Sequence, residues 1–222
     1  MSRCLWVLAT DTDAGKTYVT EGLLRALTER GCRTQALKPI ACGHEMGGVN
    51  GDVQRLLALQ PDCVADNLCC YDFAMAAAPQ IAAMVANQRV SVATVTSWLQ
   101  ARTAAKHGYQ ISLIEGVGGL MVPLNETQTF VDLLPMLPGA KVVLVVGSRL
   151  GCINHALLTL EALRNKGLTP LAMVLNDVQN NPQALVHHAQ MLQTHAPELP
   201  LLISPFHAPS AWPELAEWLL KN

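Results

Sequence analysis

The chain has 222 residues, of which 50% are hydrophobic and 14% charged, and its formal net charge at pH 7 is −2. That length suits one domain with a large core, and the apolar content excludes intrinsic disorder. Because the chain lacks a net positive charge, its composition does not favour nucleic acid or an anionic membrane surface as a partner. The longest clean apolar run, near Val142–Val146, is far shorter than the roughly 20 residues of a membrane-spanning helix.

The N-terminus and the cysteines both favour the cytoplasm. Residues 1–9 contain only a short apolar stretch, and no cleavable region of the secretory type follows it. The seven cysteines are odd in number and show no C-x-x-C spacing, so neither a disulfide framework nor a zinc knuckle is expected. We therefore expect a cytoplasmic protein with reduced thiols.

Short aliphatic strands alternate with longer helical patterns along the whole chain. The expected strands are Cys4–Ala9, Thr34–Leu37, Ile111–Ile114, Lys141–Val146, Leu171–Leu175 and Leu201–Ile203. The expected helices are Gly15–Arg30, Asp52–Leu59, Val92–His107, Cys152–Lys166, Pro182–Thr194 and Trp212–Leu220. This alternation predicts an α/β fold, a single domain spanning residues 1–222 with a doubly wound, mainly parallel sheet. Ligands of such sheets bind at the carboxyl ends of the strands, so the informative residues should follow strands.

A candidate phosphate-binding loop follows the first expected strand. The segment Ala9–Thr17 ends in Gly-Lys-Thr just where a helix is expected to begin. Gly15 lets the backbone approach a phosphate closely, Lys16 supplies a positive charge, and the Thr17 hydroxyl is a suitable Mg²⁺ ligand. The strict pattern G-x-x-x-x-G-K-[ST] is not met, because Thr10 stands where its first glycine belongs. An ordinary strand–turn–helix with a chance Gly-Lys-Thr is the competing interpretation.

Polar residues also stand at the ends of other expected strands. Lys38 could either extend to solvent or stabilise charge on a transferring phosphoryl group. Glu115 could hold Mg²⁺ opposite Thr17, or it could be a residue of a tight turn. Asn176 offers the donor and acceptor that an adenine edge requires, or it belongs to a simple turn. The residues alone leave each pair of alternatives open.

Two expected helix starts carry further candidates. Asp52, taken by itself, is expected to cap the helix that it begins. The segment Gly151–Asn154 begins a helix directly after the central strand, and free amides at such a start would bind a carboxylate. Capping by the Asn154 side chain is the alternative there.

The segment Thr10–Thr17 resembles the T-D-T-x-[VA]-G-K-T loop of dethiobiotin synthetases, ATP-dependent ring-closing enzymes of biotin synthesis. Further segments match that family in order: Leu37–Ile40, Glu115–Gly119, Val145–Gly147, Leu150–Ala156 and Val174–Asp177. The resemblance implies a P-loop NTPase type of fold, with ATP and CO₂ as substrates and Mg²⁺ as cofactor. It implies that 7,8-diaminononanoate is carboxylated and closed to dethiobiotin, with release of ADP and phosphate.

The resemblance also implies roles for individual residues. Lys38 and Lys16 would be catalytic, and the metal ligands would be Thr17, Asp52 and Glu115. The ATP-binding residues would be Asp13, Ala14, Gly15, Lys16, Thr17, Tyr18, Asp52, Glu115, Gly116, Val117, Gly118, Asn176, Asp177, Pro205, Phe206 and His207. The substrate-binding residues would be Thr12, Lys38, Cys42, Gly151, Cys152, Ile153 and Asn154. Because the last four would reach the substrate of a neighbouring subunit, the chain is expected to form a homodimer with composite sites.

The chain departs from the family at three positions. Ala9 replaces a usual glycine, which is harmless only if the backbone there keeps a negative φ. Cys42 stands where a serine is frequent and is a weaker hydrogen-bond donor. Gln80 follows Pro79 where a histidine is common.

Two other functions compete with this interpretation. A MinD- or ParA-like ATPase switch would carry an extra lysine five residues before the loop lysine, and Asp11 is there instead. An amide-forming ligase related to cobyrinate diamide synthesis normally has a glutaminase domain, for which 222 residues leave no room.

Overall fold

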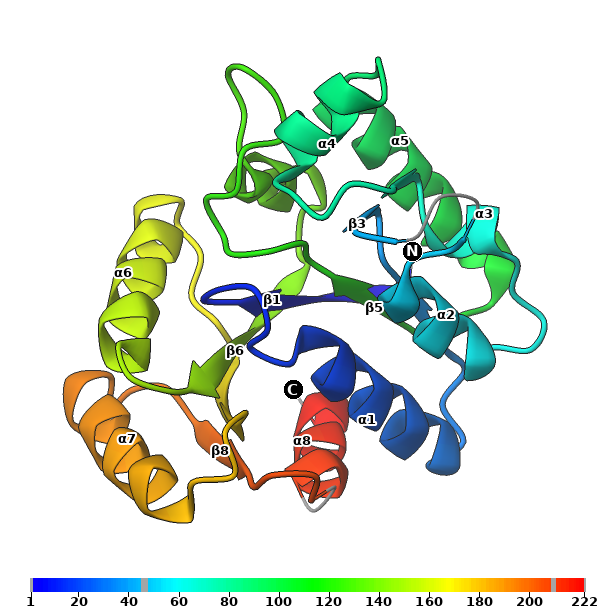
Figure 1. Cartoon of the computed structure of the whole chain (residues 1–222). Helices are drawn as coiled ribbons and strands as arrows, with labels where there is room; N and C mark the ends of the chain where they lie inside the picture. The colour runs from blue at the N-terminus through cyan, green and yellow to red at the C-terminus, as the bar shows by residue number, and fades with distance from the viewer. Residues whose placement is uncertain (1, 45–47, 209–210, 222) are drawn as a thin grey trace.

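A computed structural model of the chain describes residues 2–44, 48–208 and 211–221. Its main sheet contains β1 (Arg3–Ala9), β2 (Thr34–Leu37), β5 (Ile111–Glu115), β6 (Lys141–Ser148), β7 (Ala172–Asp177) and β8 (Leu201–Ser204). These strands lie in the order β2-β5-β1-β6-β7-β8, and every neighbouring pair is parallel. The prediction of a doubly wound parallel sheet is therefore confirmed (Figure 1).

Helices cover both faces of this sheet. They are α1 (Lys16–Glu29), α2 (Gly51–Ala58), α3 (Ala65–Leu68), α4 (Pro79–Val85), α5 (Val92–Arg102), α6 (Cys152–Asn165), α7 (Pro182–His195) and α8 (Ala211–Lys221). One hydrophobic core packs α1, α2 and α8 against one face, and a second core packs α4, α5, α6 and α7 against the other. Figure 1 shows the resulting three layers, with the sheet seen nearly edge-on between them.

The side-chain alternation of the central strands explains why both faces are covered. Along β1, Leu5 and Val7 join the core beneath α1, whereas Trp6 and Leu8 join the opposite core. The same alternation runs through β6 and β7. Strands with apolar side chains on both faces are stable only between two layers of helices, which is the condition of a parallel sheet.

A second, small sheet was missed by the sequence patterns. It pairs β3 (Ile40–Cys42) with β4 (Tyr71–Phe73) in parallel. Each strand has only three residues, too few to show a period-two pattern. Because β3 begins two residues after Lys38, the small sheet starts close to the carboxyl end of β2.

The expected helix Val92–His107 is shorter in the structure. The helix α5 ends at Arg102, and a separate 3₁₀ turn covers Ala105–His107. Between them Ala104 adopts an extended conformation (φ −61°, ψ 143°), which interrupts the helical hydrogen bonds. A short 3₁₀ helix at Phe130–Met136 was not anticipated either, since it contains Pro135.

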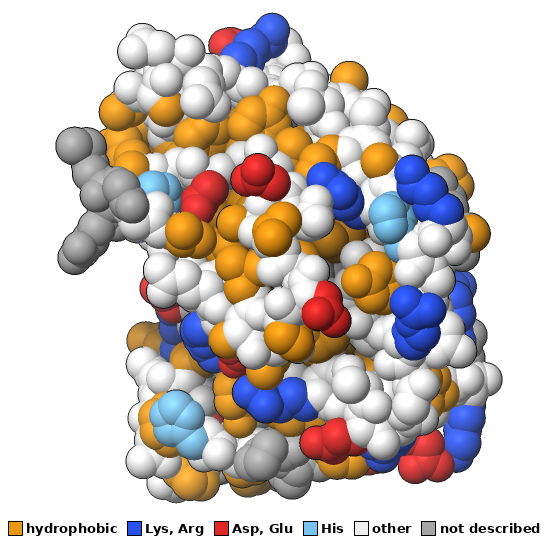
Figure 2. Space-filling view, turned by 90° about the vertical axis from the view of Figure 1, so that its right-hand side faces the viewer, with side chains coloured by type: hydrophobic (Ala, Val, Ile, Leu, Met, Phe, Trp, Pro, Cys, Tyr) orange, Lys and Arg blue, Asp and Glu red, His pale blue; other side chains and the backbone are white. Residues whose placement is uncertain are grey.

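Within the described ranges, no helix is long and apolar enough to cross a membrane. The side of the molecule with α2, α3 and α5 faces the viewer in Figure 2. Acidic and basic side chains are interspersed on that face, and they form no single positive patch there.

Candidate active site

The loop between β1 and α1 is held in place by its neighbour β7. Gly15 has φ +94°, and a Cβ there would lie 2.1 Å from Nδ2 of Asn176. That amide nitrogen donates a 3.0 Å hydrogen bond to the Ala14 carbonyl. A larger residue at position 15 would have to displace Asn176 from this bond. By contrast, Ala9 lies in β1 and is not among the described residues with positive φ, so alanine fits there without strain.

Lys16 folds back over its own loop. Its Nζ donates to the Gly118 carbonyl at 2.9 Å and to the Asp11 carbonyl at 3.3 Å. Burial, together with the nearby positive charge of Lys38, lowers the pKa of Lys16 to about 8. The ammonium is therefore held by neutral carbonyl groups that a phosphate would outcompete.

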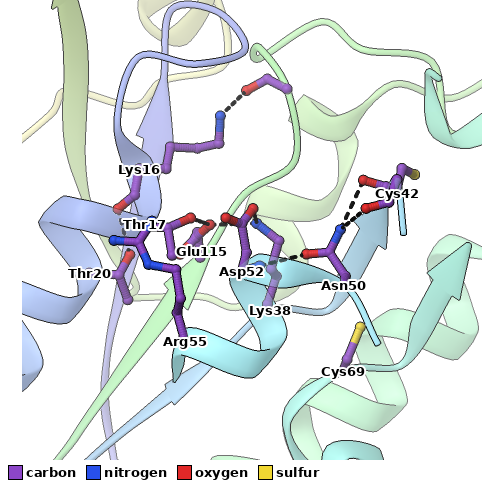
Figure 3. A network of polar contacts seen from close by, with 12 residues as sticks. Lys16, Thr17, Thr20, Lys38, Cys42, Asn50, Asp52, Arg55, Cys69 and Glu115 are labelled. Atoms are coloured by element: carbon purple, nitrogen blue, oxygen red, sulfur yellow. Dashed lines mark hydrogen bonds and ion pairs between the residues drawn. The ribbon is translucent and has the colours of Figure 1, made fainter. Parts of the chain in front are cut away.

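Lys38 lies at the centre of a buried charge cluster (Figure 3). Its Nζ donates to Asp52 Oδ2 at 2.8 Å and to Glu115 Oε1 at 2.5 Å. The Thr17 hydroxyl donates to the same Glu115 oxygen at 2.7 Å. Burial alone would lower the pKa of Lys38, but the two carboxylates raise it above its ordinary value. Lys38 is only 3% exposed, so the alternative that it extends to solvent is wrong.

Asp52 does not cap its helix, contrary to expectation. The cap of α2 is Asn50, whose side chain accepts a 2.9 Å hydrogen bond from the Asp52 backbone nitrogen. Capping by Asn50 leaves the Asp52 carboxylate in the first helical turn, where it pairs with Lys38. Burial alone would raise the pKa of Asp52, but Lys38 lowers it below its ordinary value. Asn50 also donates to the Cys42 and Gly43 carbonyls, which ties α2 to the end of β3.

The oxygen atoms around Lys38 fit a hard divalent cation. Asp52, Glu115 and Thr17 supply two carboxylates and one hydroxyl, the donor types that Mg²⁺ prefers. Glu115 is fully buried, and its second oxygen, Oε2, has no hydrogen-bond partner. An unpartnered buried carboxylate oxygen is costly unless a cation or donor binds it. No group of three or more His, Cys, Asp or Glu side chains suited to a metal occurs among the residues described.

Two cavities that share part of their walls lie at this site. A cavity of about 320 Å³, which we call the phosphate cavity, is lined by Thr12, Asp13, Gly15, Lys16, Thr17, Tyr18, Lys38, Cys42, Asp52, Arg55, Val117 and Gly118. A second cavity of about 380 Å³ adjoins it and is lined by Thr12, Cys42, Ala76, Ala77, Ala78, Pro79, Val117, Gly118 and Val122. Because Thr12, Cys42, Val117 and Gly118 line both, a ligand of the second cavity would lie beside the phosphate cavity. We call the second one the apolar cavity, since alanine, valine and proline side chains make up most of its wall.

Cys42 is at the boundary of these two cavities. It ends β3, and burial raises the pKa of its thiol to about 11. The thiol is therefore protonated at neutral pH and is available only as a weak hydrogen-bond donor. Gln80 does not line either cavity, although Pro79 before it lines the apolar one.

A third cavity, of about 230 Å³, lies at the carboxyl ends of β7 and β8. It is lined by Tyr18, Arg55, Asn176, Asp177, Val178, Phe206 and His207, and we call it the base cavity. Asn176, Asp177, Phe206 and His207 are brought together here as expected, whereas Pro205 does not line the cavity. The turn after β7 is organised by Asp177, whose Oδ1 accepts from the backbone nitrogens of Gln179 and Asn181. Arg55 and Val178 were not predicted to line this cavity. For Arg55 the reason is that nothing in the sequence places α2 beside this edge.

The start of α6 is not part of the walls of these three cavities within one chain. Gly151 is its N-cap with φ 90°, and no side chain caps the helix, so capping by Asn154 is wrong. Cys152 is buried, whereas Asn154 is exposed. None of the residues 151–154 lines the phosphate, apolar or base cavity. The predicted substrate contact of this segment therefore stays a prediction.

Comparisons with known proteins identify relatives of this chain. A family model described as an AAA domain matches residues 3–204. The ATP-dependent dethiobiotin synthetase of Cellvibrio japonicus is 39% identical over 202 residues, covering 88% of this chain and 86% of that protein. The corresponding protein of Escherichia coli O157:H7 is 36% identical over 220 residues, covering 96% and 92%. The chain belongs to the dethiobiotin synthetase family.

Solved structures of more distant proteins share its fold. The septum site-determining protein MinD of Pyrococcus horikoshii, complexed with Mg-ADP, has a TM-score of 0.58 at 17% identity and covers 99% of this chain and 96% of its own. Cobyrinic acid a,c-diamide synthase of Mycobacterium smegmatis, with bound ADP and magnesium, has a TM-score of 0.57 at 18% identity and covers 100% and 95%. At such identities the likeness shows a P-loop NTPase fold and not a shared function. The dethiobiotin synthetase family is thus supported by sequence, whereas the two competing functions are supported by fold alone.

Proposed function

We propose that the chain is an ATP-dependent dethiobiotin synthetase, which joins CO₂ to 7,8-diaminononanoate and closes the ureido ring with release of ADP and phosphate. The observation that carries this proposal is the position of Lys38. It lines the phosphate cavity, which shares Cys42 with the apolar cavity, and its ammonium is within hydrogen-bond distance of two carboxylates. A fixed cation in that cavity would stabilise the charge that develops during phosphoryl transfer to a carboxylated amine.

The proposed reaction has three steps. One amine of the diamine takes up CO₂ to form a carbamate, losing a proton. A carbamate oxygen then attacks the γ-phosphorus of ATP, and ADP leaves, which produces a carbamic–phosphoric mixed anhydride. The second amine attacks the carbamate carbon and loses a proton, phosphate leaves with the C–O bond electrons, and the five-membered ureido ring is closed.

The residues would act mainly by position and charge. Lys16 would turn from the Gly118 carbonyl to the β- and γ-phosphates, and Lys38 would face the transferring group from the other side. Thr17, Asp52 and Glu115 would hold Mg²⁺, which when bound would neutralise phosphate charge. Thr12 and Cys42 would line the path of the diamine into the apolar cavity, whose alanine-rich wall suits an alkyl chain. The base cavity would receive adenine, with Asn176 and Asp177 at its edge.

The substrate carboxylate would be bound by a second subunit of a homodimer. Amides at the start of α6, from Gly151 to Asn154, have no partners inside the helix and would bind a carboxylate. Because this segment lines none of the three cavities described above, we propose that it acts on the site of its partner. Exposed apolar side chains beside it, Leu150 at 98% and Leu158 at 61% exposure, support burial of this surface between two subunits. We also propose a cytoplasmic location for this dimer.

One observation speaks against a partner-binding ATPase switch. Asp11, which stands in place of the extra lysine of MinD- and ParA-like proteins, forms an ion pair of 2.6 Å with Arg149. Arg149 also donates to the Thr12 carbonyl, so its guanidinium holds this part of the loop from β6. The position of the extra lysine is therefore taken by an acidic residue that pairs within the chain itself.

The product itself tests the proposal. The purified protein would be incubated with ATP, Mg²⁺, the diamine and carbon-13-labelled bicarbonate, and the products analysed by mass spectrometry. The proposal expects one labelled carbon in a cyclic product whose mass equals that of diamine plus CO₂ minus water. Formation of ADP without any labelled cyclic product would refute it.

A further inference from the structure

Two residues line both the phosphate cavity and the base cavity. They are Tyr18, in the first turn of α1, and Arg55, in α2. A nucleotide with its terminal phosphates near Lys16 and its base near Asn176 must cross this boundary. The part that crosses consists of the ribose and the α-phosphate, and only the α-phosphate is anionic.

Arg55 is held in one orientation by an acidic residue of α1. Its Nε donates to Glu21 Oε1 at 2.9 Å, and its Nη2 donates to Glu21 Oε2 at 2.5 Å. Glu21 follows Thr17 by one helical turn, and Arg55 follows Asp52 by about one turn. Two parallel bonds of this kind fix the plane of a guanidinium group. Figure 3 shows the Arg55 side chain rising from α2 toward the level of Thr17.

The ion pair leaves part of the guanidinium available to a ligand. The Arg55 side chain is 50% exposed, whereas that of Glu21 is 17% exposed. Nη1 of Arg55 has no hydrogen-bond partner among the residues that the structure describes. The two bonds to Glu21 use one edge of the group, so the other donors remain for an anion in the adjoining cavities.

We propose that Arg55 is a nucleotide-binding residue that contacts the α-phosphate, and that Glu21 is the residue that positions it. This inference rests on the proposed use of ATP, but it concerns a contact that the proposed reaction does not require. It also explains why α2 carries an arginine one turn beyond Asp52. The same short helix would then approach the nucleotide twice, through the metal ligand and through the guanidinium.

The test compares two ligands that differ only in the α-phosphate. Affinities of the full chain for adenosine and for AMP would be measured by calorimetry, without Mg²⁺, for the wild type and for Arg55→Met. We expect AMP affinity to fall by about 10- to 100-fold in Arg55→Met, the range of a hydrogen bond to a charged group, with adenosine affinity within about twofold. Arg55→Lys should retain part of the AMP affinity, since it keeps the charge and loses the planar fork.

Arg89→Met is the matched control. Arg89 also pairs with a glutamate, Glu126, but both are exposed and neither lines the three cavities. This variant should bind AMP as the wild type does. If Arg55→Met leaves Glu21 unpaired and the protein melts early, the double variant Glu21→Gln/Arg55→Met removes the unpaired charge and is measured instead.

Unchanged AMP affinity in the folded Arg55 variant would overturn the inference. An equal loss of adenosine and AMP affinity would also overturn it, since that would show a role in shaping the base cavity. In either case, diamine-dependent turnover by the wild type would leave the proposed function standing. If the wild type makes labelled cyclic product and the Arg55 variant loses only AMP affinity, the proposed function and the role of Arg55 are both supported.

Discussion

A single ammonium group balances two carboxylates in this site, of which only one is buried. Lys38 contacts both Asp52 and Glu115, and Glu115 is completely buried. In the absence of a metal ion, this lysine supplies the positive charge that Glu115 needs in a low-dielectric setting. If Mg²⁺ were held by the same carboxylates, the ammonium would become available to a transferring phosphoryl group. Under the proposed function, Lys38 would thus connect metal binding with catalysis.

Lys38→Ala should lose activity far more than nucleotide affinity. A cation aimed at charge that develops in the transition state contributes about 3–4 kcal/mol, so kcat should fall by about 10²- to 10³-fold. The Kd for ATP should stay close to that of the wild type, whereas Lys16→Ala should weaken ATP binding as well as rate. Stopped assays and calorimetry on both variants, with melting curves as the folding control, would measure this. A near-normal kcat in the Lys38 variant would contradict the assignment.

The raised pKa of Cys42 predicts slow alkylation of this residue. With a pKa of about 11, only about one thiol in a thousand is ionised at pH 8. Because the thiolate is the reactive form, modification by iodoacetamide should accelerate nearly tenfold per pH unit between pH 8 and 10. Peptide mass spectrometry would follow Cys42 while circular dichroism confirms the fold at each pH. Rapid modification at pH 7 would contradict the buried, protonated thiol.

Cys42→Ser tests what the thiol contacts. If position 42 faces the diamine, the serine hydroxyl is the stronger donor, and the KM for the diamine should fall or stay unchanged. If the thiol packs only against apolar groups, the hydroxyl costs about 1–3 kcal/mol of stability. The location of Cys42 at the boundary of two cavities favours the first outcome. A lower Tm with unchanged KM would favour packing.

At the scale of elements, the loop before α1 depends on β7. Gly15→Ala would place a methyl group against Nδ2 of Asn176 and would also strain a backbone with φ +94°. We expect it to lower stability by about 1–3 kcal/mol and to abolish nucleotide binding. Gly31→Ala is the control, since Gly31 has φ +77° but a Cβ added there would meet no atom within 4 Å. Chemical denaturation of both variants would separate the steric contact with Asn176 from the backbone strain. Equal losses of stability in both variants would show that backbone strain alone accounts for the loss.

The elements differ in how far the sequence could predict them. The strands β1, β6 and β7 carry long aliphatic patterns, and the structure places them close to the expected residues. The small sheet of β3 and β4 has too few residues to leave a pattern, although it positions Cys42. Asn50 caps α2 and Asp52 does not, because the Asp52 carboxylate has a stronger partner in Lys38. Local preference could not reveal that partner, which is distant in sequence.

The residues of the candidate site also differ in how far the sequence could predict their positions. Lys16, Lys38 and Glu115 could be placed from the sequence, because they follow strands whose carboxyl ends meet at one edge. Arg55 could not, since its position depends on how α2 packs against α1 through the Glu21 pair. Pro205 was expected beside the base but does not line that cavity, although the next two residues do.

At the scale of the whole molecule, the proposed site needs two subunits. Asn154→Ala should raise the KM for the diamine without changing ATP affinity, because it alters only the segment that would bind the carboxylate. Mixed with Lys38→Ala, it should recover activity, since a heterodimer then has one site with both wild-type halves. In an equimolar mixture, about half of the dimers are heterodimers, and each of these has one intact site out of two. About a quarter of the wild-type rate is therefore expected. No gain, despite demonstrated subunit exchange, would place carboxylate binding within one chain.

The dependence of ATP turnover on the two other substrates tests the central claim most directly. Phosphate release would be followed with ATP and Mg²⁺ present and with the diamine, the bicarbonate or both omitted in turn. Because the phosphoryl acceptor exists only after CO₂ has joined an amine, we expect turnover solely when both are present, with one phosphate released per ring closed. Full phosphate release with ATP and Mg²⁺ alone would contradict the account and would favour an ATPase switch.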